Sequence, residues 1–212
     1  MTFVENPHWM NPPVLAGVPL ARARAVGVMI HGRLQRPDVM LDAVARLGLD
    51  DVGYVLPVAY EHSWYPGRYF EPVAHNQPDV TWSLSAFELT LARVIDAGVP
   101  PERTVLAGFG QGGCLVAELV ARAPRPFAGV AVLAGGLLGP DGEQTEPARV
   151  DGLPMLFACS RHDEWIELER VQSSARAFER AGALVEVEIY DDREHAIGDA
   201  AVAATRNLFA HA

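Results

Sequence analysis

The sequence predicts a three-layer α/β fold, in which a mostly parallel sheet is covered by helices on both faces. Strand-like and helix-like segments alternate along nearly the whole chain. Most of the strand-like segments are continuous apolar runs, which is typical of strands buried on both faces of a parallel sheet. The chain has 212 residues, a length that favours a single domain, and we expect that domain to span residues 1–212.

The strands are expected where short apolar runs end at a glycine, a proline or a polar residue. The first run stops at His31-Gly32, and the second is closed by Pro57. Each later run is followed by a loop or by the start of a helix. In chain order, the expected strands are residues 26–30, 52–57, 104–108, 129–135, 154–160 and 184–190.

The helices are expected where apolar residues recur every three or four positions. In the first of them, five apolar side chains share one face, and Gly48 suits its C-terminal end. Residues 58–79 follow neither pattern, and a loop this long and aromatic is usually functional. In chain order, the expected helices are residues 36–48, 80–98, 112–123, 168–182 and 197–212.

The composition excludes several classes of function. The net charge of −10 argues against nucleic acid or an anionic membrane as a partner, because both attract clusters of Lys and Arg. No apolar run approaches the ~18 residues of a transmembrane helix, and we see no secretory signal. With only Cys114 and Cys159, a reduced cytoplasmic protein is the simplest interpretation. A small-molecule substrate is the expected partner, a homodimer is allowed, and no cofactor is expected.

Candidate catalytic residues stand where the predicted strands end, which is where parallel sheets place their binding sites. Asp163 follows one strand and His195 follows the next. In such a pair the acid fixes the imidazole tautomer and steadies the imidazolium, while the imidazole moves the proton. The helix that starts near Gln111 would aim its N-terminal amides at the same place. With an amide from Arg33 or Leu34, these could form an oxyanion hole.

Six short motifs span nearly the whole chain: HGR at 31–33, SWYP at 63–66, GFGQGG at 108–113, CSRHD at 159–163, LERV at 168–171 and IYDDREH at 189–195. Together they resemble those of the small phospholipase/carboxylesterase group of α/β-hydrolases. The turn at residues 108–112, which corresponds to the nucleophile elbow of these enzymes, comes before Asp163 and His195, and this chain order is that of the α/β-hydrolase triad. The resemblance implies an α/β-hydrolase fold without a large lid domain, Asp163 as the triad acid, His195 as the triad histidine, and the Gln111 amide as an oxyanion donor.

The sequence departs from this family at the position of the nucleophile. The family reads Gly-Phe-Ser-Gln-Gly-Gly, and this chain has Gly110 in place of the serine. Loss of a triad serine costs about a millionfold in rate, although glycine adopts the φ > 0 of the elbow freely. Three further departures lie near the same site: residues 191–194 replace Pro-Gly-Met-Gly, a proline near residues 166–167 is missing, and residues 34–36 are large. The clustering favours natural divergence over an engineered Ser-to-Gly change.

Other candidate residues have structural as well as functional interpretations. Cys114 lies one helical turn after Gly110, so we expect a buried cysteine rather than a substitute nucleophile. His31 either orients a loop or lines the substrate pocket. Three further histidines show no metal-ligand spacing, and we expect no metal site. The aromatic residues of the 58–79 loop either line an apolar pocket or pack the loop: Trp64, Tyr65, Tyr69 and Phe70.

Three accounts of the missing serine remain open. In the first, the chain is an enzyme in which His195–Asp163 acts as a general base without an acyl-enzyme. Its substrate would be a small ester, lactone or enolisable carbonyl compound. In the second, the pocket only binds a ligand. In the third, the chain is a carboxylesterase inactivated by a Ser-to-Gly substitution at 110. Retention of both Asp163 and His195 favours the first.

Overall fold

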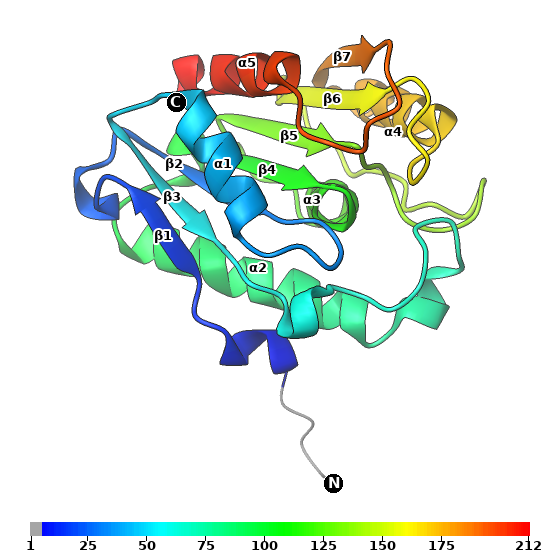
Figure 1. Cartoon of the computed structure of the whole chain (residues 1–212), viewed down its shortest axis with the longest axis horizontal. Coiled ribbons are helices and arrows are strands. Elements are labelled where there is room, and N and C mark those ends of the chain that lie inside the picture. Colours follow the sequence, from blue (N-terminus) through cyan, green and yellow to red (C-terminus); the bar gives the residue numbers. More distant parts are fainter. Residues whose placement is uncertain (1–5) are drawn as a thin grey trace, which may run out of the picture.

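One seven-stranded sheet organises the molecule, as the computed structural model of residues 6–212 shows (Figure 1). The strands run in the order β1-β3-β2-β4-β5-β6-β7. All neighbouring strands are parallel except β1, which pairs antiparallel with β3. The mostly parallel sheet is therefore confirmed. The strands are β1 (Val14–Gly17), β2 (Ala25–Ile30), β3 (Val52–Leu56), β4 (Thr104–Phe109), β5 (Gly129–Leu133), β6 (Pro154–Ser160) and β7 (Leu184–Tyr190).

Five α-helices cover the two faces of this sheet. Helices α1 and α5 contact each other on one face, and α2 and α3 contact each other behind the sheet (Figure 1). The central strands β2 to β5 are buried along their whole length, which explains their continuous apolar sequences. The helices are α1 (Asp38–Leu47), α2 (Asp79–Asp96), α3 (Gln111–Arg122), α4 (Leu168–Arg180) and α5 (Asp199–Leu208).

The edge strand β1 was not predicted from the sequence. It has only four residues, and alternate side chains such as Leu15 are exposed. A run this short, between prolines, carries little periodic signal, and its strand geometry depends on pairing with β3. The segment 58–79 is irregular, as expected, with short 3₁₀ turns at Tyr60–His62 and Val73–Asn76. No helix within residues 6–212 has an apolar stretch long enough to cross a bilayer.

The turn from β4 into α3 brings two backbones unusually close together. A Cβ atom on Gly112 would overlap the Ile30 carbonyl oxygen and would lie 2.7 Å from the His31 carbonyl oxygen. Both oxygens belong to backbone that cannot swing aside. Glycine at this position therefore allows the first turn of α3 to rest against the end of β2.

We predict that Gly112→Ala lowers the free energy of unfolding by more than about 2 kcal/mol, because the added methyl group meets rigid backbone. In a thermal melt this corresponds to a loss of more than about 5 °C. The matched control is Gly198→Ala, since no described atom lies within 4 Å of a Cβ placed there and its φ is −70°. Equal melting temperatures for the two variants would contradict the prediction.

Candidate active site

The loops that follow β2, β4, β6 and β7 meet around a cavity of about 670 Å³. The cavity lies beyond the carboxyl ends of the parallel strands, where binding sites of such sheets are usually found. Most ligand pockets have volumes of about 300–1,000 Å³, so the cavity is large enough for a small organic molecule. Each of the four loops contributes to the site: its walls include Arg33, Gly110, Gln111, Trp165 and His195.

Gly110 lies in the sharp turn between β4 and α3, in the wall of this cavity. Its backbone has φ 56° and ψ −118°, so the positive φ expected from the sequence is confirmed. The Gly110 amide donates to the Leu133 carbonyl at 3.0 Å, and its carbonyl accepts from the Cys114 amide at 3.0 Å. These two hydrogen bonds hold the turn in place without any side chain at residue 110.

His195 and Asp163 form a hydrogen-bonded pair. The Nδ1 atom of the imidazole lies 2.8 Å from Oδ2 of the carboxylate. The Asp163 side chain is fully buried, whereas 22% of the His195 side chain is exposed at the cavity. Because an ionised carboxylate only accepts hydrogen bonds, the proton of the neutral ring belongs on Nδ1. The lone pair of Nε2 is then free.

The carboxylate of Asp163 is stabilised in its charged form. Burial raises its pKa, but three hydrogen bonds act in the opposite direction and leave the pKa below its ordinary value. The His195 ring donates one of them. The amides of Trp165 and Ile166 donate the others to Oδ1, at 2.8 and 3.0 Å.

The open ring nitrogen of His195 is directed at Gly110. A Cβ atom on Gly110 would lie 3.2 Å from Nε2. Phe109 packs on the ring, with the two ring centroids 4.5 Å apart. Glu194 immediately precedes His195 in the loop after β7. Its carbonyl accepts a hydrogen bond from the Ser160 hydroxyl at 2.7 Å, which fixes this loop to the end of β6. The direction of the imidazole is thus set by its surroundings and not by residue 110.

At the cavity wall, the backbone amides of Arg33 and Gln111 have no hydrogen-bond partner within residues 6–212. Gln111 is the first residue of α3, where the helix dipole favours negative charge. The prediction for Leu34 is corrected, because its amide donates to the His62 carbonyl at 2.7 Å and is not available to a ligand. The Gly32 amide is likewise not available to a ligand, because it donates to Oε1 of the Gln35 side chain.

The sequence matches the family model described as Phospholipase/Carboxylesterase over residues 22–210. The chain belongs to the phospholipase/carboxylesterase family. A phospholipase/carboxylesterase from Dyadobacter fermentans is 29% identical, with a TM-score of 0.86 and coverage of 94% of this chain and 96% of that one. A carboxylesterase from Mesorhizobium loti is 20% identical, with a TM-score of 0.73 and 94% of both chains covered. A search of curated protein sequences found no significant match.

The chain has the α/β-hydrolase fold of the phospholipase/carboxylesterase family. Of the four aromatic residues predicted to line its pocket, two do and two do not. Tyr65 and Tyr69 line the cavity. Trp64 is completely buried instead, and its Nε1 donates to the His31 carbonyl at 2.8 Å. Phe70 is 46% exposed and lies outside the cavity, edge-on to Tyr69. The prediction that Trp64 and Phe70 line the pocket is therefore corrected.

His31 holds the loop after β2 and does not line the cavity, which corrects the pocket prediction for this residue. It is 1% exposed. Its Nδ1 lies 2.7 Å from the Gly32 carbonyl, and its Nε2 accepts from the Ala59 amide at 3.1 Å. Burial lowers the pKa of His31 to about 4. The ring is neutral, and it joins the loop carrying Arg33 to the aromatic loop.

The Gln111 side chain has a structural role that sequence reasoning did not find. Its Oε1 accepts from the Trp64 amide at 3.1 Å, and its Nε2 donates to the Tyr65 carbonyl at 2.7 Å. The amide group therefore fixes the aromatic loop over the start of α3. An isolated Gln after a glycine has many interpretations, so only its partner across the fold identifies this one.

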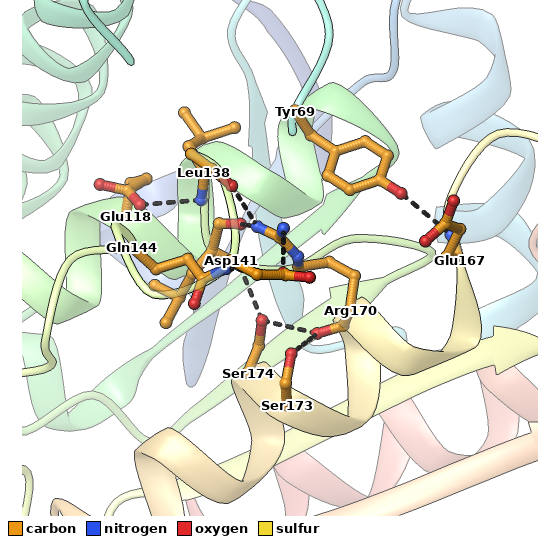
Figure 2. A network of polar contacts seen from close by, with 11 residues as sticks. Tyr69, Glu118, Leu138, Asp141, Gln144, Glu167, Arg170, Ser173 and Ser174 are labelled. Atoms are coloured by element: carbon orange, nitrogen blue, oxygen red, sulfur yellow. Dashed lines mark hydrogen bonds and ion pairs between the residues drawn. The ribbon is translucent and has the colours of Figure 1, made fainter. Parts of the chain in front are cut away.

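A buried arginine network behind the cavity was also not predicted (Figure 2). The Arg170 guanidinium donates to the carbonyls of Leu137 and Gly139 at 2.6 and 2.7 Å and pairs with Asp141 at 3.0 Å. It also lies over the Tyr69 ring, 5.2 Å from the ring centroid. The network thus supports one aromatic wall of the cavity.

The remaining candidates are placed as follows. Cys114 is fully buried, as expected, and burial raises its pKa to about 11, so it is not a substitute nucleophile. Residues 191–194 form an exposed loop. None of their side chains makes a hydrogen bond or ion pair with His195 in the described structure. In residues 6–212, no three His, Cys, Asp or Glu side chains are grouped to hold a metal ion.

We predict that His31 makes the stability of the protein depend on pH. Its pKa is about 4 in the folded chain and about 6.5 in the unfolded chain, so between these values the unfolded state binds more protons. Stability is full above pH 6.5 and falls by up to about 3 kcal/mol as pH drops to 4. The variant His31→Gln cannot titrate. The difference in unfolding free energy between the parent protein and this variant should therefore become smaller as pH falls.

Urea unfolding at pH 7, 6, 5 and 4.5 measures this difference. The control is His75→Gln, because this histidine is exposed. We expect it to follow the parent at every pH. If His31→Gln were less stable than the parent by the same free energy at every pH, the lowered pKa of His31 would be contradicted.

Proposed function

We propose that this protein is a hydrolase-like enzyme that acts on a small molecule by general-base catalysis, without a covalent intermediate. The expected substrate is a small ester, lactone or enolisable carbonyl compound. One observation carries the proposal: His195 is bonded through Nδ1 to a buried carboxylate at 2.8 Å, while its Nε2 faces a cavity wall that has no side chain at Gly110. The carboxylesterase descriptions of the family and of the Dyadobacter fermentans relative support the ester class.

In this mechanism Nε2 of His195 removes a proton from a water molecule or from an acidic C–H group of the substrate. Asp163 holds the proton of the neutral ring on Nδ1, so that Nε2 carries the lone pair, and it stabilises the imidazolium that forms. For an ester or lactone, the activated water attacks the carbonyl carbon and negative charge moves to the carbonyl oxygen. The imidazolium then returns the proton to the departing alkoxide, which balances the step.

The developing oxyanion would be stabilised by the amides of Arg33 and Gln111, which have no other partner in the described structure. A positioned general base contributes about 10²–10⁴-fold, and one oxyanion donor about 10²–10³-fold. These effects together are enough for a reactive ester, a strained lactone or an acidic C–H group. They are too small for a stable amide.

We predict that His195→Ala reduces turnover by at least about 10²-fold and leaves ligand binding intact, because only the base is removed. The unmodified protein is first assayed on a panel of aryl esters, lactones and enolisable ketones, and the best substrate is used for the comparison. The control is His162→Ala, an exposed histidine one residue before the acid. If ligand binds and no turnover is found, the protein is a binding protein and not an enzyme. Turnover that His195→Ala leaves unchanged would rule out His195 as the base.

We predict that Gly110→Ser raises the hydrolysis of short p-nitrophenyl esters. The new Cβ would lie 3.2 Å from His195 Nε2, so the hydroxyl group is within reach of the ring. The positive φ costs about 1–3 kcal/mol of stability for a side chain, and the ring must shift slightly.

Two controls isolate the role of the hydroxyl group. Gly110→Ala adds the same Cβ without the oxygen, and Gly110→Ser combined with His195→Ala removes the base. The gain should be absent in both. A folded Gly110→Ser variant with no His195-dependent gain would mean that the elbow and the pair are not arranged as a dormant triad.

A further inference from the structure

Two arginine side chains, Arg33 and Arg68, line the cavity beside the His195–Asp163 pair. Neither forms an ion pair within residues 6–212. The chain as a whole carries a net charge of −10, and it contains 27 carboxylate residues against 17 basic ones. Two arginines without an acidic partner at one site are therefore unexpected on charge grounds.

Arg33 is held in place by backbone carbonyls of the aromatic loop. Its NH2 group donates to the Pro66 carbonyl at 2.6 Å, and its NH1 group donates to the Gly67 carbonyl at 3.1 Å. A guanidinium group has five N–H donors, so three remain for a ligand. The residue also supplies the open backbone amide described above.

Arg68 is held in place by aromatic rings. Its guanidinium carbon lies 5.4 Å from the ring centroid of Trp165 and 5.7 Å from that of Phe70. Its guanidinium group has no hydrogen-bond acceptor among the described residues, so all five donors are open. Trp165 follows the acid by two residues, and its ring centroid is 6.5 Å from that of His195. This places the Arg68 guanidinium on the same side of the cavity as the catalytic pair.

Negative charge around this part of the cavity is limited. Glu71 lines it, but its Oε1 already accepts from the Arg68 backbone amide at 3.1 Å. Asp163 is buried behind the histidine and is paired with it. The cavity wall thus carries two open guanidinium groups and one carboxylate. In a low-dielectric cleft such an imbalance attracts anions.

We propose that the substrate carries an anionic group, a carboxylate or a phosphate, in addition to its reacting carbonyl, and that Arg33 and Arg68 bind this group. The proposal rests on the proposed function for the reaction itself. Arginine suits this role because its planar fork matches the oxygen atoms of both anions. The aromatic contacts of Arg68 leave its donors open while restricting where they point.

Binding measurements test the proposal without any turnover. The probes are 4-phenylbutyrate, its neutral analogue 4-phenylbutyramide, and 3-phenylpropyl phosphate, titrated by calorimetry into the full chain. We expect at least one of the two anions to bind more tightly than the amide, and the tighter one identifies the anion. Arg68→Gln should weaken the binding of that anion by about three- to tenfold and leave the affinity for the amide unchanged. Raising the salt concentration should reduce the preference.

Two further variants separate a local effect from one of net charge. Arg36→Gln removes the same charge from the loop that carries Arg33, but Arg36 is paired with Asp38 and does not line the cavity. It should leave anion binding unchanged. Glu71→Gln removes the one opposing charge and should tighten anion binding.

Three results would overturn the proposal: equal affinity for the anions and the amide, an equal loss in Arg68→Gln and Arg36→Gln, or no binding of either anion at millimolar concentration. Each of these is independent of the proposed reaction. His195-dependent turnover with no preference for anions would leave the reaction standing and remove only the substrate class. A preference for anions without any turnover would support the anion-binding role of the two arginines and contradict the proposed reaction.

Discussion

The close approach of α3 to the end of β2 is the constraint on which the site depends. Gly112 allows the first turn of the helix to rest against the carbonyls of Ile30 and His31. This contact brings the Gln111 amide beside the loop that carries Arg33. It also turns Gly110 toward the histidine that follows β7. Any side chain at residue 112 would separate these elements, and the amides and the imidazole would no longer face one space.

The His195–Asp163 pair owes its geometry to its own surroundings and not to a side chain at residue 110. Asp163 receives hydrogen bonds from the ring and from two backbone amides, which satisfy a fully buried carboxylate. Phe109 packs on the imidazole from the strand before the elbow. None of these contacts involves a side chain at residue 110. The arrangement therefore does not depend on a side chain at residue 110, and the Nε2 atom of His195 faces the cavity with glycine there.

The arginines around the site differ in what binds them. Arg170 is 5% exposed, and its donors are used by two carbonyls and Asp141, so it is a structural support for Tyr69 (Figure 2). Arg33 and Arg68 are exposed at the cavity, and most or all of their donors are open. A buried guanidinium must be satisfied within the fold, because desolvation is costly. A partly solvated guanidinium group keeps its donors open at little cost. This difference is why we propose an anion-binding role for Arg33 and Arg68 and a supporting role for Arg170.

The sequence by itself determined the parallel sheet, the helices, and the strand ends at which Gly110, Asp163 and His195 stand. These follow from short-range apolar patterns and turn residues, which act within one element. The tertiary structure alone decided which side chains reach the cavity. Trp64 and His31 turn inward because they find buried partners there, and the Leu34 amide bonds to His62. The strand β1 and the cavity positions of Arg68 and Trp165 were also settled only by packing. Such contacts join residues far apart in the chain, and no local pattern encodes them.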